Sequence, residues 1–118
     1  MKKIIIVGAT GSLSAEIFKY LSKLNTKIAV IDLPSPTLKK YNKLSNVSTF
    51  EADITNEKDF IASFIKAQKY LRKLDVLINC ASMTSEFATN SDQYFKQFHE
   101  YNLETWNKAI EINLTGTF

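Results

Sequence analysis

Residues 2–17 narrow the possible folds of this chain more than any other segment. Residues 4–7 are four branched apolar side chains, the length and composition of a strand buried on both faces. Gly8 and Gly11 then indicate a tight turn. Apolar residues at helical spacing follow, namely Leu13, Ile17, Leu21 and Leu24. The segment therefore predicts a strand, a glycine turn and a helix in succession.

A helix that begins directly after a buried strand is suited to hold a phosphate group. Its first N–H groups lack intrahelical acceptors and the positive end of its dipole faces the turn, so a dinucleotide pyrophosphate is stabilised there. Glycines let the ligand approach the backbone without a Cβ in the way. The small residues here follow the spacing Gly8-x-x-Gly11-x-x-Ser14, with serine at the third position. An ordinary strand-to-helix turn is the alternative, and context decides between the two.

A second buried strand is predicted over residues 27–32, and it ends in a carboxylate. Asp32 follows the glycine turn by about 20 residues, the spacing of a ribose-binding acid. Its carboxylate would accept hydrogen bonds from both adenosine ribose hydroxyls and would repel a 2′-phosphate, which predicts NAD over NADP. The alternative is an acid that is merely solvated at the end of a strand.

Strands and helices are predicted to alternate further along the chain. A short polar helix is expected over residues 37–44, a third strand over Val47–Glu51 and a fourth, buried strand over residues 75–82. Thr55 is expected to cap a long helix whose apolar side consists of Phe60, Ile61, Phe64, Ile65, Leu71 and Leu74. This alternation predicts one α/β domain over residues 1–118, a Rossmann-like doubly wound parallel sheet of about four strands with helices on both faces.

Two polar residues follow the third and fourth strands. Asp53 is either a turn residue or, in a dinucleotide-binding fold, a contact to the adenine. Asn79 is expected at the carboxyl end of the fourth strand. Open parallel sheets bind ligands at the edge that the carboxyl ends of their strands form, although Asn79 can equally hold neighbouring backbone together.

Residues 83–118 carry two weaker signals. Residues 83–101 have no clear period, and their aromatic side chains favour packing under the domain or against a partner. Asn102 is predicted to cap a last helix with Leu103, Trp106, Ile110 and Asn113 on one stripe. Because a polar side chain on an apolar stripe needs a hydrogen-bond partner, Asn113 is expected to have one.

Composition excludes several classes of function. Fifteen basic and twelve acidic residues leave a net charge of +3, too small and dispersed to indicate nucleic-acid binding. Cys80 is the single cysteine, which excludes an internal disulfide, fits a reducing compartment and is expected to be a buried, inert thiol. His99 is the single histidine, so no metal site is expected. No segment has the roughly 20 apolar residues of a membrane span, and a cytoplasmic location is expected.

These motifs resemble the N-terminal half of a short-chain dehydrogenase/reductase, over essentially all 118 residues. Five motifs carry the resemblance: the glycine motif at residues 8–14, Asp32, the pair Asp53-Ile54, the Asn-Cys-Ala-Ser sequence at residues 79–82, and the helix from Trp106 to Asn113 with Leu-Thr-Gly after it. Two positions depart from the family pattern. Ser14 replaces a glycine of the first motif and is expected to weaken cofactor binding or to shift the helix slightly. Ser82 replaces the last glycine of the family's Asn-Asn-Ala-Gly motif, which is a milder change.

The resemblance implies NAD as cofactor, held by Gly8, Thr10, Gly11, Ser12, Leu13, Asp32, Asp53, Ile54, Asn79, Ala81 and Ser82. Backbone at residues 10–13 would hold the pyrophosphate, and residues 79–82 would border the adenosine and the nicotinamide ribose. Asn113 would be the helix-kinking asparagine of a catalytic tetrad, holding a water in the proton relay.

The family's reaction also needs a serine and a Tyr-x-x-x-Lys motif, and no tyrosine of this chain has lysine at the fourth following position. The catalytic half is therefore expected to be missing, together with three of seven strands, which leaves an unpaired edge beside the fourth.

Two functional hypotheses follow. The first is the cofactor-binding half of an NAD-dependent oxidoreductase that moves hydride between the nicotinamide and a small-molecule carbonyl or secondary alcohol, inactive by itself. Family members usually pair through the helix that contains Trp106, which implies a homo-oligomer. The second is a non-catalytic nucleotide-binding or interaction module derived from the same fold. Coding sequence beyond Phe118 that contains Tyr-x-x-x-Lys would favour the first, and a genuine stop codon the second.

Overall fold

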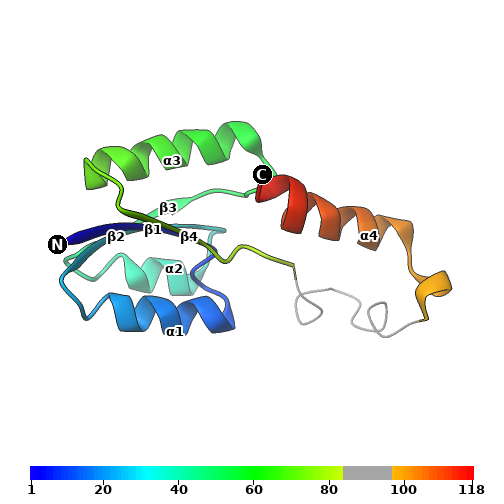
Figure 1. Ribbon diagram of the computed structural model, residues 1–118, viewed down its shortest axis with the longest axis horizontal. Helices are drawn as coiled ribbons and strands as arrows, with labels where there is room; N and C mark the ends of the chain where they lie inside the picture. The colour runs from blue at the N-terminus through cyan, green and yellow to red at the C-terminus, as the bar shows by residue number, and fades with distance from the viewer. Residues whose placement is uncertain (84–96) are drawn as a thin grey trace.

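A computed structural model describes residues 1–83 and 97–118 (Figure 1). Its sheet consists of β1 (Lys2–Val7), β2 (Thr26–Asp32), β3 (Val47–Glu51) and β4 (Val76–Asn79). All strand pairs are parallel, and the strand order is β3-β2-β1-β4. The helices are α1 (Ser12–Leu21), α2 (Pro36–Tyr41), α3 (Glu57–Leu71) and α4 (Leu103–Ile110), with a short 3-10 helix η3 (Phe98–Glu100) and a π-helix η4 (Glu111–Gly116).

Both faces of the sheet are covered, because successive residues of a strand point to opposite sides. One core contains Ile4, Ile6, Ile28 and Val30, packed against Phe18 of α1 and Leu38 of α2. The opposite core contains Ile5, Val7, Ala29 and Ile31, packed against Ala67 and Leu71 of α3. Figure 1 shows α1 and α2 on one side of the sheet and α3 on the other. The predicted doubly wound parallel sheet is confirmed.

The predicted apolar sides of two helices are partly wrong. In α1 the buried residues are Ser14 and Phe18, whereas Leu13 is 74% exposed. In α3 the small residues Ser63 and Ala67 are buried, and Ile61 and Ile65 lie outside the core. Small side chains let these helices lie close to the sheet, so the buried stripe is rotated away from the one that the larger apolar residues indicate.

One of the two predicted helix caps is confirmed. Asn102 caps α4, as predicted, by accepting a hydrogen bond from the Glu104 N–H. Thr55 does not cap α3, because its N–H and hydroxyl both bond to Asp53, and Asn56 is the N-cap instead. The expectation of a Thr55 cap was therefore wrong by one residue.

The fourth strand is shorter and more exposed than predicted. It ends at Asn79, and within the described residues it pairs only with β1, so it lies at an edge of the sheet. Val76 and Leu77 are exposed, which corrects the expectation of a buried strand and agrees with the expected unpaired edge. Cys80 is half-buried rather than buried. The aromatic residues Tyr94 and Phe95 lie outside the described residues.

Candidate cofactor-binding site

The sequence-predicted residues meet at the carboxyl edge of the sheet. Because all four strands are parallel, the segments after β1, β2, β3 and β4 emerge on the same side. Gly8 to Leu13 follow β1, Asp32 ends β2, Asp53 follows β3, and Asn79 ends β4. Figure 1 shows that α4 and η4 lie beyond this edge, connected to β4 by the segment that includes the grey trace.

Gly8 makes the closest backbone approach in the site. Its φ is +74°, a conformation that residues with a Cβ rarely adopt. A Cβ built on Gly8 would lie 2.5 Å from the Ala81 nitrogen and 2.6 Å from the Ala81 Cα. Only glycine fits here, because both the backbone angle and the contact with the segment after β4 exclude a side chain.

The N-terminus of α1 has the features of an anion site. Its N-cap, Gly11, has extended backbone and provides no side-chain cap, and the first turn contains no acid. The other α-helices of the described residues are capped by Ser35, Asn56 and Asn102. The N–H groups and dipole of α1 are thus left for a partner outside the helix, which fits a pyrophosphate.

Ser14, which replaces the expected glycine, is buried beneath this turn. Its Oγ donates to the Gly8 carbonyl at 2.6 Å and lies 3.1 Å from the Gly11 carbonyl oxygen. The side chain is 2% exposed, so its hydroxyl lies between α1 and the turn rather than in the site.

Asp32 is tied to the glycine turn. Its Oδ2 accepts a hydrogen bond from the Thr10 N–H at 2.8 Å, and its Oδ1 accepts one from the Leu33 N–H, also at 2.8 Å. The carboxylate is half-buried and therefore more than a solvated acid at the end of a strand. Each oxygen retains a second lone pair that can accept a further hydrogen bond.

Tyr41 contributes to the site and was missed by the sequence analysis. Its hydroxyl donates to the Ala9 carbonyl at 3.3 Å, and its ring stacks on Phe18 with a centroid distance of 3.8 Å. Burial raises the pKa of the Tyr41 phenol, and the charges of Asp32 and Glu16 raise it further. The signal in the sequence was its position three residues after the buried Leu38, on the same side of α2.

Asp53 lines a hollow after β3, and Ile54 follows it in the chain. Asp53 Oδ1 accepts hydrogen bonds from the Thr55 N–H at 2.9 Å and the Thr55 hydroxyl at 2.8 Å, which is the geometry of a turn residue. The hollow has a volume of about 380 Å³, and Leu33, Pro34 and Asp53 are among its lining residues. Ile54 lies against the end of η4, because a Cβ on Gly116 would be 3.0 Å from its Cγ2.

Two asparagines connect the end of β4 to η4. Asn79 Oδ1 accepts from the Ala81 N–H at 3.0 Å, and its Nδ2 donates to the Thr117 hydroxyl at 3.2 Å. Asn113 Oδ1 accepts from the Met83 N–H at 2.6 Å, and its Nδ2 donates to the Met83 carbonyl at 3.1 Å. Asn113 therefore has the partner that the sequence predicted, and it lies in a π-helical turn, a geometry frequent at functional sites.

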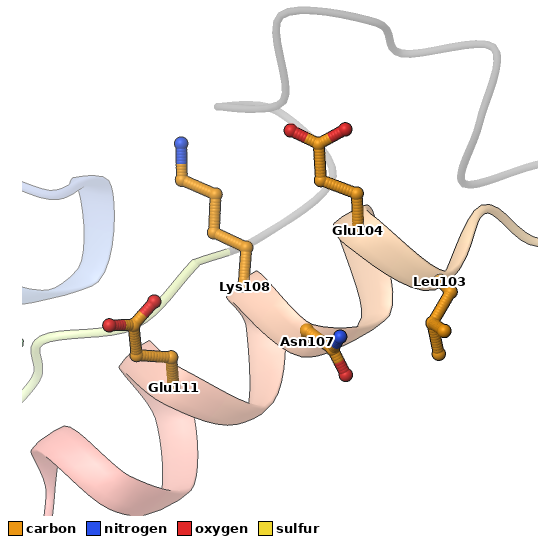
Figure 2. Close-up of a pocket in the computed structure, with 5 residues that line it drawn as sticks. All are labelled: Leu103, Glu104, Asn107, Lys108 and Glu111. Carbon is orange, nitrogen blue, oxygen red and sulfur yellow. The ribbon is translucent and has the colours of Figure 1, made fainter.

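A second hollow, of about 500 Å³, lies on α4 away from these residues. Its lining comes from one helix alone: Leu103, Glu104, Asn107, Lys108 and Glu111. In Figure 2, Glu104 and Lys108 extend from one side of the helix and Leu103 from the other. None of the predicted cofactor-binding residues lines it.

Two other kinds of site are absent from residues 1–83 and 97–118. No group of three or more His, Cys, Asp or Glu side chains there could hold a metal ion. No helix in the same residues has the length and apolar character needed to cross a membrane.

Comparison with known proteins identifies the class. A family model described as short chain dehydrogenase matches residues 2–118, so the chain belongs to the short-chain dehydrogenase family. The chain is 29% identical over 116 residues to 3-hydroxyacyl-CoA dehydrogenase type-2 of Bos taurus and 28% identical to that of Drosophila melanogaster. These alignments cover 97% of this chain, and the chain spans less than half of either relative, 43% and 44%.

A solved structure agrees on the fold. A short-chain dehydrogenase/reductase variant from Serratia marcescens superposes with a TM-score of 0.81 at 19% sequence identity. The superposition covers 99% of this chain and 46% of the other.

Proposed function

We propose that the carboxyl edge of the sheet binds NAD(H) and that residues 1–118 are the cofactor-binding half of a dehydrogenase. The pyrophosphate would lie at the backbone of Thr10 to Leu13, the adenosine ribose at Asp32 and the adenine beside Asp53 and Ile54. Asn79, Ala81 and Ser82 would border the nicotinamide ribose. In the whole protein the cofactor supplies hydride exchange with a small-molecule carbonyl or secondary alcohol, and this chain's residues bind and orient it.

The observation that carries this proposal is the uncapped start of α1 directly after the Gly8 turn. Gly11 leaves the first N–H groups without a side-chain acceptor. The contact between Gly8 and Ala81 brings the end of β4 against the same turn. A dinucleotide needs both features, because its pyrophosphate requires N–H donors and its two nucleosides extend to either side of them.

NAD rather than NADP is proposed because of Asp32. Two unit charges about 4 Å apart repel by roughly 1 to 4 kcal/mol at effective dielectric constants between water and a protein surface. A 2′-phosphate next to the Asp32 carboxylate would meet repulsion of this order, which corresponds to fivefold weaker binding or more.

Asn113 is proposed to act through the segment after β4. Both ends of its side-chain amide bond to Met83, so the amide holds this segment against η4. The role in a proton relay that the resemblance implies remains part of the proposal for the whole protein.

Pairing with a second copy through α4 is proposed as well. Leu103 and Trp106 on α4 and Leu114 on η4 are at least half exposed. A row of apolar side chains of this kind is typical of an interface. Light scattering of the purified protein checks this, since a mass of one chain at micromolar concentration would contradict it.

The test of cofactor binding is calorimetric titration of the full chain with NAD⁺ and with NADP⁺. We expect NAD⁺ to bind at least fivefold more tightly, and Asp32→Asn to reduce this preference because the charge is removed. Glu51→Gln is the matched control, since Glu51 ends β3 at the level of Asp32 in the neighbouring strand. No binding of either dinucleotide, or an equal loss of preference in both variants, would contradict the proposal.

The expected inactivity of the chain by itself has a separate test. Purified chain should not oxidise NADH in the presence of a panel of aldehydes and ketones. Carbonyl-dependent oxidation by the 118-residue chain would show that the remaining half is not needed.

A further inference from the structure

The hydroxyl of Ser14 lies under the glycine turn, where the family pattern has no side chain. Its 2.6 Å bond to the Gly8 carbonyl is short for a hydroxyl donor, and the Gly11 carbonyl at 3.1 Å is a weaker second acceptor. Within the described residues Ser14 is the only donor to the Gly8 oxygen. Without this hydroxyl, a carbonyl beneath α1 would lose its partner, which is costly for a buried group.

The direction of a carbonyl fixes the direction of the next N–H. A trans peptide group is planar, so its C=O and N–H point in opposite directions. Because the Ser14 hydroxyl holds the Gly8 oxygen beneath the turn, the N–H of Ala9 is directed away from it. The Gly11 oxygen is held by the Ala15 N–H at 2.8 Å, with Ser14 as a weaker second donor, and the N–H of Ser12 points the opposite way from that oxygen. These amides border the start of α1, where the proposed pyrophosphate lies.

Two further bonds hold the peptide group between these positions. The Ala9 oxygen accepts from the Tyr41 hydroxyl, and the Thr10 N–H of the same peptide donates to Asp32. Side chains from α1, α2 and β2 thus fix the two successive peptide groups that begin with the Gly8 and Ala9 carbonyls. Ser14 is the member of this set that replaces a family glycine.

We propose that Ser14 is a positioning residue that orients the turn amides toward the cofactor's phosphates. This inference rests on the proposed function, and it reverses the expectation that serine weakens binding. A glycine at position 14 would leave the Gly8 carbonyl without its donor and free to rotate, whereas the Gly11 carbonyl would keep its bond from the Ala15 N–H. Rotation would turn the Gly8 oxygen toward the phosphates in part of the population.

The test compares Ser14→Ala and Ser14→Gly with the unmodified full chain. Ser14→Ala keeps the Cβ and removes only the hydroxyl. The control is Ser22→Ala, which removes a similar hydroxyl–carbonyl bond, to Lys19, at the other end of α1. Circular dichroism verifies folding, calorimetry measures the Kd of ADP and of adenosine, and hydrogen exchange measures the backbone amides of residues 9–12.

We expect both Ser14 variants to bind ADP about fivefold more weakly, the equivalent of one hydrogen bond. Adenosine lacks phosphates, so its Kd should change less than twofold, whereas general loosening of the fold would weaken both ligands alike. Amide exchange at residues 9–12 should accelerate in the Ser14 variants and stay unchanged in Ser22→Ala.

Three results overturn the inference. These are equal or tighter ADP binding by Ser14→Gly, equal weakening of ADP and adenosine, and unchanged exchange at residues 9–12. If the unmodified chain binds neither ligand, the proposed function fails, and the role of Ser14 in orienting the turn is then decided by the exchange rates alone.

Discussion

Replacing Gly8 by alanine tests the contact on which the geometry of the site depends. At a φ of +74°, an L-residue is strained by about 1 to 2 kcal/mol relative to its ordinary conformations. The new Cβ would also lie 2.5 Å from the Ala81 nitrogen, and this neighbour is backbone that cannot rotate away. Forcing an extra carbon into a packed position destabilises by roughly 1 to 3 kcal/mol more. The two contributions give an expected loss of about 2 to 5 kcal/mol in the free energy of unfolding.

Gly11→Ala is the matched control, three residues along the same turn. Gly11 has a φ of −71°, which alanine adopts readily, and its Cβ would lie 3.3 Å from the Ser14 hydroxyl and 4.0 Å from the Gly8 carbonyl oxygen, the second an ordinary contact. Loss of a glycine N-cap and the lower entropy of the unfolded alanine chain nearly offset each other, each at about 1 kcal/mol or less. Urea unfolding followed by circular dichroism measures both variants. Equal losses for Gly8→Ala and Gly11→Ala would refute the reasoning.

Three further predictions concern contacts around the site. Asn113→Ala removes the side-chain acceptor of the Met83 N–H and should accelerate hydrogen exchange of that amide about fivefold. The control variant Asn107→Ala should leave the Met83 exchange rate unchanged. An unaltered rate in Asn113→Ala would contradict the contact. Tyr41→Phe removes the hydroxyl bond but keeps the ring stack, and it should lower the free energy of unfolding by about 1 kcal/mol. Tyr41→Ala also removes the stack and should lower it by about 2 to 4 kcal/mol. Equal losses in the two variants would count against the stacking argument. The pKa of Asp75 is lowered by its bonds to Lys73 and the Lys3 N–H, so its stabilisation is present above pH 3.8 and is lost as the pH falls through the lower folded-state pKa. Between about pH 5 and about pH 2, the melting temperature of Asp75→Asn should therefore fall less than that of the unmodified chain. An identical fall in both proteins would exclude a stabilising role for the Asp75 carboxylate.

The order of strands and helices could be predicted because local signals agreed along the chain. Runs of branched residues such as 4–7 became buried strands. The Val47–Glu51 strand has the predicted bounds, and the Pro36–Tyr41 helix overlaps the predicted one but ends three residues earlier. The helix faces were harder to predict. Ser14 and Ser63 are polar by type, yet both are buried because their hydroxyls bond to carbonyls of the adjacent strand or turn, at Gly8 and Glu51.

The sequence predicted where the site residues lie in the fold, but not the hydrogen bonds that they form. Sequence spacing placed Asp32 and Asn79 at the carboxyl edge, where the structure has them. Spacing could not indicate that Asp32 binds the Thr10 amide or that Tyr41 reaches the Ala9 carbonyl. The first bond depends on how the end of β2 meets the turn, and the second on how α2 packs against it. The apolar run of β4 did not indicate its exposure, since such a run reads the same at a sheet edge as in its centre, and only the family resemblance predicted the unpaired edge beside it.

The central claim is that a dinucleotide binds at the carboxyl edge through the turn before α1. Backbone amide chemical shifts of the ¹⁵N-labelled full chain, recorded during titration with NAD⁺, test it most directly. The account predicts saturable shifts concentrated in residues 9–13, at Asp32 and Leu33, and at residues 53–54 and 79–82. Saturable shifts confined to the α4 hollow around Asn107, or no saturable shifts at millimolar NAD⁺, would contradict it.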